Sequence, residues 1–138
     1  MKIQRSFISF LDSNGIHYTK TDSLVSFKQG DVIFIFLCDA QDPNFFRMVI
    51  PNIDIGTDMS QINEKLDRLT QNYKVGKAEL LGGKVWLVFE QFVSDLSADN
   101  TSLFIRSVKI LTSMFNELRT MIYGGDSSIN NENPASET

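Results

Sequence analysis

The feature that most constrains this fold is an unbroken apolar run at residues 32–38, which reads Val-Ile-Phe-Ile-Phe-Leu-Cys. A strand with one face in water alternates apolar and polar side chains, whereas a strand covered on both faces is apolar throughout. The run is far too short to span a bilayer, and its β-branched and aromatic residues favour a strand. Residues 84–93 have a similar composition, interrupted by Glu90 and Gln91. We therefore expect two central strands that need cover on both faces.

Gly82 and Gly83 indicate a β-hairpin near the middle of the chain. They separate the expected strands at residues 74–81 and 84–93 by two positions. A two-residue hairpin loop requires positive φ angles, which glycine adopts without steric cost. These two strands are therefore predicted to be antiparallel neighbours.

The other strands are expected in the N-terminal half of the chain. A strand at residues 45–50 follows the run at residues 32–38, and Pro51 is expected to end it because proline cannot donate a ladder hydrogen bond. The first strand is either residues 16–21, which alternate apolar and polar side chains, or residues 24–28 just after them. The pattern alone leaves both alternatives open.

Helical periodicity predicts three helices. Apolar residues recur at helical spacing over residues 3–13 and, on a broader arc, from about residue 101 to residue 123. The middle helix is expected to begin at Asp58, an N-cap residue with Gln61 in the capping-box position. Its apolar stripe is narrow, so we expect it to lie on the surface and to bury only one edge. The stripe consists of Met59, Ile62, Leu66, Leu69 and Tyr73.

Together these elements predict one α+β domain over residues 1–123, in the order helix-β-β-β-helix-β-β-helix. We expect an antiparallel sheet with the first and last helices packed on one face. The chain contains eleven Phe residues, which predicts a Phe-rich core. Residues 124–138 are rich in Ser, Asn and Glu, so they are predicted to be a disordered polar tail.

Charge and cysteine content narrow the class of partner. The formal net charge is -4 and the Lys and Arg residues are not clustered, which argues against nucleic acid and anionic lipid. Cys38 is the only cysteine, so no intramolecular disulfide can form and a reducing, cytoplasmic location is expected. No apolar run approaches the length of a membrane span. A soluble protein with a protein partner, and no membrane partner, is the expectation that remains.

The sequence contains no complete catalytic, metal or cofactor motif. The single histidine, His17, and the single cysteine cannot make a zinc site, so no metal and no cofactor are expected. Residues 81–84 resemble a fragment of a phosphate-binding loop but lack its first glycine and its Ser or Thr. Glu90 is either a buried acid, a residue on the solvent-facing part of its strand, or a strand residue paired with a neighbouring cation. We expect a non-enzymatic protein. The alternative is a small-ligand-binding or enzymatic domain with a pocket near Glu90 or His17.

The remaining feature is a shortage of cover for the sheet. Two strands require apolar surroundings on both faces, but only the first and last helices have broad apolar arcs. The narrow middle helix can cover little of the second face, and exposed apolar patches of that kind mark interfaces. The candidate interaction residues are Trp86, Val88 and Phe92, or the alternate set on the same strand, together with Met59 and Ile62.

The element order, the acidic composition, the strands at residues 32–38 and 84–93, and the helix at residues 103–123 resemble one known fold group. It is the fold shared by the YbjN-domain proteins and the class I type III secretion chaperones. The resemblance covers residues 3–123 and involves no diagnostic motif. It implies a non-enzymatic, often dimeric protein that holds a partner chain along apolar sheet and helix surfaces. Nothing in the sequence points to a secretion system, so a YbjN-like regulatory or chaperone-like role and a homodimer are expected.

Overall fold

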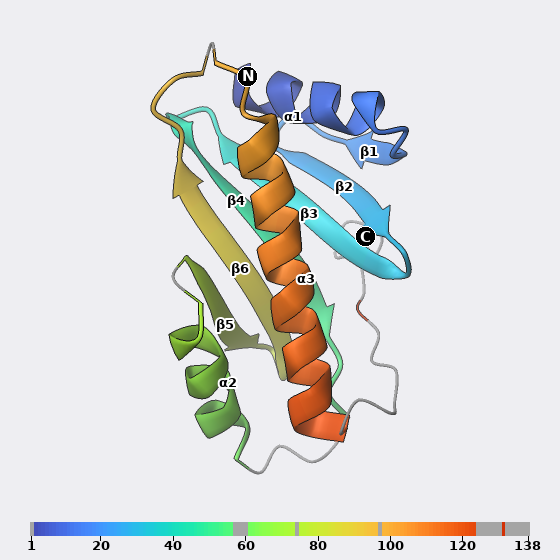
Figure 1. The fold of residues 1–138 in the computed structure, drawn as a ribbon, viewed down its shortest axis with the longest axis vertical. Coiled ribbons are helices and arrows are strands. Elements are labelled where there is room, and N and C mark those ends of the chain that lie inside the picture. Colours follow the sequence, from blue (N-terminus) through green and yellow to red (C-terminus); the bar gives the residue numbers. More distant parts are fainter. Residues whose placement is uncertain (1, 57–60, 74, 97, 124–130, 132–138) are drawn as a thin grey trace.

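The computed structural model describes residues 2–56, 61–73, 75–96, 98–123 and 131. Within these ranges the helices are α1 (Lys2–Ser13), α2 (Ile62–Gln71) and α3 (Thr101–Tyr123). The strands are β1 (Tyr18–Lys20), β2 (Leu24–Gln29), β3 (Val32–Asp39), β4 (Asp42–Ile53), β5 (Gly76–Leu81) and β6 (Lys84–Phe92). They form one antiparallel sheet in the order β1-β2-β3-β4-β6-β5 (Figure 1).

The predicted α+β fold is confirmed, with one more strand than expected. Both candidate first strands form, because β1 and β2 pair with each other and the Thr21 N–H donates to the Leu24 carbonyl across their connection at 2.8 Å. Four strands therefore precede α2. The glycine hairpin forms as predicted, since Gly82 and Gly83 have φ angles of 58° and 79° and join β5 to β6.

Pro51 does not end β4, which continues to Ile53. A register shift separates Ile50 from Ile53, where pairing with β6 resumes opposite Val85. On its other side, β4 pairs with β3 as far as Val49 opposite Ile35. The prediction for Pro51 is therefore wrong for the strand as a whole, although the proline lies where β4 leaves β3.

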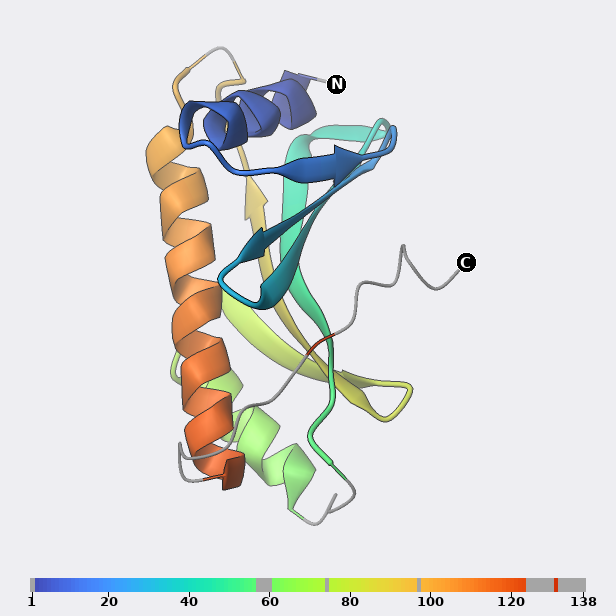
Figure 2. The same cartoon turned by 90° about the vertical axis from the view of Figure 1, so that its right-hand side faces the viewer.

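All three helices lie on the same face of the sheet, as Figure 2 shows along one side of the molecule. The buried residues of α2 join the core cluster that also contains α1 and α3 residues, and they are Ile62, Leu66 and Leu69. α2 packs against β5 and α3. The narrow middle helix therefore adds nothing to the cover of the second face.

The start of α2 differs from the capping-box prediction. Gln61 is the N-cap residue itself, with a φ angle of 60°, and its side chain makes no capping hydrogen bond. Asp58 and Met59 lie outside the described residues. Of the predicted polar tail at residues 124–138, only Asn131 is described, so the disorder of that segment stays a prediction.

Glu117 ties the end of α2 to α3. One of its carboxylate oxygens accepts a hydrogen bond from Asn72 Nδ2 and the other accepts one from the Tyr73 hydroxyl, both at 2.8 Å. Burial, followed by the hydrogen bond and charge of Glu117, raises the pKa of Tyr73 to about 12. Tyr73 thus packs its ring against the core and fixes the end of α2 with its hydroxyl.

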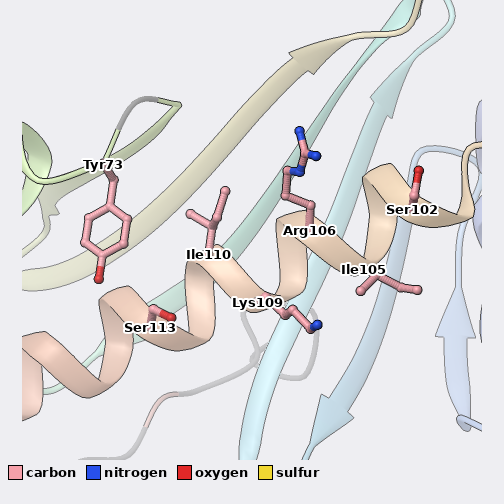
Figure 3. Close-up of a pocket in the computed structure, with 7 residues that line it drawn as sticks. All are labelled: Tyr73, Ser102, Ile105, Arg106, Lys109, Ile110 and Ser113. Atoms are coloured by element: carbon pink, nitrogen blue, oxygen red, sulfur yellow. The ribbon is translucent and has the colours of Figure 1, made fainter.

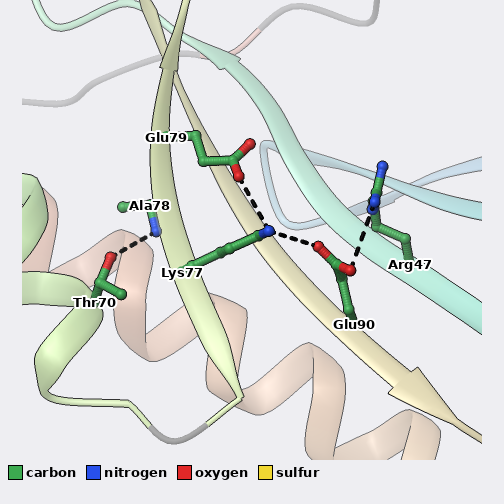
Figure 4. Close-up of polar contacts among 6 residues, drawn as sticks. All are labelled: Arg47, Thr70, Lys77, Ala78, Glu79 and Glu90. Carbon is green, nitrogen blue, oxygen red and sulfur yellow. Dashed lines mark hydrogen bonds and ion pairs between the residues drawn. The ribbon is translucent and has the colours of Figure 1, made fainter.

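Both edges of the sheet are blunted. At one edge β1 has three residues, which is short for a strand that could template pairing with another chain. At the other edge the Ala78 N–H of β5 donates to Thr70 Oγ1 of α2 at 3.0 Å (Figure 4). α2 therefore shields the outer edge of β5 as well as part of the core.

The core between helices and sheet is rich in Phe, as predicted. Phe7 of α1 stacks on Phe36 of β3, with ring centroids 4.3 Å apart and planes inclined by 5°. Phe104 of α3 meets Phe7 and Phe46 edge-on, with centroid distances of 5.1 and 5.8 Å. One ring from α3 therefore links α1 to the sheet.

We predict that Phe104→Ala lowers the free energy of unfolding by about 3–5 kcal/mol, because it removes a fully buried ring and leaves a cavity. Ile105→Ala, at the neighbouring exposed position of α3, is the control and should change it by about 0.5 kcal/mol or less. Urea unfolding followed by far-UV circular dichroism measures both variants. Equal losses for the two variants would contradict the central place given to Phe104.

Candidate interaction surface

β3 sends alternate side chains to opposite faces of the sheet, as its sequence predicts. The set beneath the helices consists of Phe34, Phe36 and Cys38. The set on the opposite face consists of Ile33, Ile35 and Leu37. β6 divides in the same way, with Leu87 and Phe89 in the main core and Trp86 and Val88 on the opposite face. Both of these interior strands therefore have apolar side chains on both faces.

We call this second surface the helix-free face, because none of the described helices lies on it (Figure 2). Its apolar cluster draws on β2, β3, β4 and β6. The residues are Leu24, Ile33, Ile35, Leu37, Val49, Trp86 and Val88. Ile35 and Val49 of this cluster are each 1% exposed. The face is thus a compact apolar layer with an outer surface that the described helices leave open.

The helix-free face is hollow. In Figure 2 the β3–β4 turn and the β5–β6 turn both project away from α3, on either side of this face. A cavity of about 130 Å³ lies within it. Its lining residues are Leu37, Arg47, Val49, Lys77, Glu79, Leu81, Trp86, Val88 and Glu90. The half-buried Trp86 therefore lies at the hollow of the face, among both apolar and charged side chains.

A charged row crosses the helix-free face beside the apolar cluster (Figure 4). It consists of Arg47, Glu90, Lys77 and Glu79. Arg47 of β4 lies opposite Glu90 of β6 in the register, and Arg47 Nη2 is 3.5 Å from Glu90 Oε2. Lys77 Nζ of β5 is 2.8 Å from Glu90 Oε1 and 3.1 Å from Glu79 Oε1. The charges alternate in sign, so each has an opposite neighbour.

The charged row explains the unusual position of Glu90 in an apolar strand. The hydrogen bond from Lys77 is the main cause that lowers the pKa of Glu90, with the charge of Arg47 adding to it against desolvation. The hydrogen bond to Glu90 is in turn the main cause that raises the pKa of Lys77. Of the interpretations of Glu90, the strand residue paired with neighbouring cations is the correct one.

The structure places the predicted interaction residues in different surroundings. Trp86 and Val88 belong to the helix-free face, where Trp86 is half-buried and Val88, at 3% exposed, presents no surface of its own to a partner. Phe92 ends β6 and is 64% exposed, with its ring 5.0 Å from that of Phe45. Ile62 is 6% exposed within the main core, so it presents no surface to a partner, and Met59 lies outside the described residues.

His17 and Glu90 do not come together. His17 is exposed just before β1 and lines an open depression of about 780 Å³, whose lining includes no carboxylate. The cavity at Glu90 has no histidine in its lining and is smaller than the roughly 300–1,000 Å³ typical of ligand pockets. Neither place therefore offers the pairing of a carboxylate with a histidine that the enzymatic alternative required.

A further depression of about 350 Å³ lies along α3 beside Tyr73 (Figure 3). Its two cations, Arg106 and Lys109, point to opposite sides of the helix in Figure 3, so they do not form a paired anion site. Within the described ranges, no group of three His, Cys, Asp or Glu side chains is placed to hold a metal ion. No helix in that part of the chain is both long and apolar enough to cross a membrane.

We predict that Glu90→Gln lowers the free energy of unfolding at neutral pH by up to about 1 kcal/mol, because it breaks two ion pairs. The folded-state pKa of Glu90 lies below its unfolded value of about 4.3, so the folded protein binds fewer protons there than the unfolded chain. This contribution is full above the unfolded pKa and is lost as the pH falls through the folded pKa. The gap between parent and Glu90→Gln should therefore close on acidification.

The matched control is Glu64→Gln, which removes the exposed pair of Glu64 with Arg68 one helical turn away in α2. It should cost no more than about 0.5 kcal/mol at neutral pH. Urea unfolding at a series of pH values measures all three proteins. A gap for Glu90→Gln that stays constant down to acidic pH would show that the ion pairs are not its cause.

Comparison with known proteins supports the fold. No protein-family model and no curated protein matches the chain. An uncharacterized protein from Methanothermobacter thermautotrophicus matches with a TM-score of 0.66 and 15% identity, over 90% of this chain and 98% of the other. YbjN from E. coli, described as a proposed transcription regulator, matches with a TM-score of 0.61 and 11% identity, over 88% and 93% of the two chains. The chain therefore has a YbjN-like fold, as its sequence resemblance implied.

Proposed function

We propose that this protein is a non-enzymatic, cytoplasmic binding module of the YbjN-like type, with a regulatory or chaperone-like role, that holds a partner polypeptide on the helix-free face. The simplest partner is a second copy, which gives a homodimer. The observation that supports the proposal is the set of half-buried apolar side chains Leu24, Ile33, Leu37 and Trp86, which pack against the buried Ile35, Val49 and Val88 on a sheet face that the described helices leave open. An apolar patch with a polar rim is typical of a protein interface.

Trp86 is the anchor of the proposed interface. Tryptophan is among the residues that contribute most to binding energy, above all where a partner removes it fully from water. Trp86 is half-buried in the free chain, and its Nε1 has no hydrogen-bond acceptor among the described residues. The ring is therefore held in place by packing, and a partner that covers it gains about 25 cal/mol for each Å² of apolar surface removed from water.

The charged row would determine how a partner is oriented on the helix-free face. The side chains of Arg47 and Lys77 are each 46% exposed and that of Glu79 is 40% exposed, so all three remain accessible to a partner. Charges of both signs in a fixed order select a partner surface with the complementary order, and they fix the register of the complex. Because the charges are already paired within the chain, a partner that covers them does not leave any of them buried alone.

The state of Cys38 supports the non-enzymatic part of the proposal. A nucleophilic cysteine needs a lowered pKa and access to its substrate. Cys38 is buried in the main core, its thiol donates to the Ser23 carbonyl at 3.6 Å, and burial is the main cause that raises its pKa. The thiol is therefore protonated and packed as a small apolar group.

We predict a dimer at micromolar concentration that Trp86→Ala weakens at least about tenfold in its dissociation constant, which corresponds to about 1.4 kcal/mol. The control is Leu80→Ala, which removes exposed apolar surface from the same hairpin but on the helix-covered side. Sedimentation velocity over a concentration series measures both, and circular dichroism checks that each variant folds.

Two results would count against the proposed interface. One is a parent protein that stays monomeric throughout the micromolar range, which removes the homodimer. The other is equal self-association of the Trp86→Ala and Leu80→Ala variants, which places the contact on another surface. For a partner captured from the native cell, the same two variants should be compared by titration with the purified partner.

A further inference from the structure

The hydrogen-bonded ladder between β3 and β4 ends just before the position where a proline would have to pair. Ile35 lies opposite Val49 in the antiparallel register. Two steps further along both strands, the same register would place Pro51 opposite Ile33. Proline has no N–H, so it cannot donate to the Ile33 carbonyl as a ladder partner does. The two strands therefore cannot continue as a regular ladder at this point.

β4 turns away from β3 at this position and stays with β6. Asn52 has a positive φ angle of 51°, and the β4–β6 register shifts between Ile50 and Ile53. Pairing with β6 resumes at Ile53 opposite Val85. The result is a split between the end of β4 and the start of β3, which we call the β3–β4 split. The backbone groups of Ile33 on one side of this split need hydrogen-bond partners from elsewhere.

Asn131 fills the β3–β4 split. Its Nδ2 donates to the Ile33 carbonyl at 2.7 Å, and its Oδ1 accepts from the Ile33 N–H at 3.1 Å. Its backbone forms an antiparallel bridge with Ile53. Asn131 thus lies between β3 and β4, where its side chain pairs with one strand and its backbone with the other. It is half-buried and lies 98 positions from Ile33 in the sequence.

The chemistry of the contact is specific to a carboxamide. The Ile33 backbone presents one donor and one acceptor, and an amide side chain supplies the complementary acceptor and donor in one plane. An ionised aspartate has no donor for the Ile33 carbonyl, and alanine has neither group. A glutamine at position 131 has the same groups on a side chain longer by one methylene. With the backbone of residue 131 paired to Ile53, its amide would be displaced from the Ile33 backbone.

We propose that the β3–β4 split is a binding slot for an asparagine carboxamide, and that Asn131 of this chain is its resident ligand. The slot tethers a polar stretch that cannot bury enough apolar surface to dock by itself. It also satisfies backbone groups that another chain could otherwise pair with. The inference stands on the split and on Asn131, and it does not depend on the proposed function of the helix-free face.

The test is hydrogen exchange at the Ile33 amide in the full chain, read by two-dimensional NMR. In Asn131→Ala, this amide should exchange at least about tenfold faster than in the parent, because its acceptor is removed. The amide of Ile35, one pairing step along β3, is the internal reference and should be unchanged. Asn133→Ala, in the same polar segment, is the matched control and should leave Ile33 protected.

A peptide of residues 126–136 then tests the slot directly. Added to the full-length Asn131→Ala variant, it should restore slow exchange at Ile33, whereas the same peptide with alanine at the position of Asn131 should not. Unchanged exchange at Ile33 in Asn131→Ala, or equal effects of Asn131→Ala and Asn133→Ala, would overturn the proposal. Protection that falls on dilution of the parent would overturn the intramolecular assignment, since the ligand would then come from a second copy.

Discussion

The structure depends on two interior strands, β3 and β6, that have apolar side chains on both faces of the sheet, while the described helices cover only one face. β3 divides its residue types between the faces, with the rings of Phe34 and Phe36 toward the helices. The aliphatic residues Ile33, Ile35 and Leu37 point the other way. Large rings fill the space beneath α1 and α3, and Ile35, Val49 and Val88 form a second buried cluster on the opposite face. The core and the open apolar face are therefore two consequences of one strand composition.

The charged row makes such an open face compatible with a stable chain. A broad apolar sheet surface favours non-specific association, and charges placed within it oppose that association. Here Glu90 of β6 forms ion pairs with Arg47 and Lys77, which lie on the strands on either side of it. Arg47, Lys77 and Glu79 stay partly exposed in the free chain, and the two cations outweigh the desolvation of Glu90, whose pKa is lowered. The row also restricts partners to those that can follow its order of charges.

Periodicity within each segment predicted the helices, the glycine hairpin and the double-sided character of β3 and β6. It could not predict features that depend on which strands become neighbours. Arg47 and Glu90 pair because β4 lies beside β6, although α2 and β5 intervene in the chain. Likewise, the narrow stripe of α2 indicated how much it buries but not on which face, so Ile62 was assigned to a surface that it does not reach. Alternation along β6 divided its side chains into two sets but did not show which set faces the helices. The packing of the helices shows that Trp86 and Val88 lie on the helix-free face.

Pro51 shows how one residue can act differently on the two sides of a strand. Toward β6, β4 absorbs the proline with a register shift and pairs again at Ile53. Toward β3, the loss of the N–H ends the ladder and leaves the backbone of Ile33 to be satisfied by another group. Here the Asn131 carboxamide supplies both the donor and the acceptor that the Ile33 backbone requires. The proline that the sequence marks as a strand terminator is thus better understood as the residue that opens a place in the sheet for a distant part of the chain.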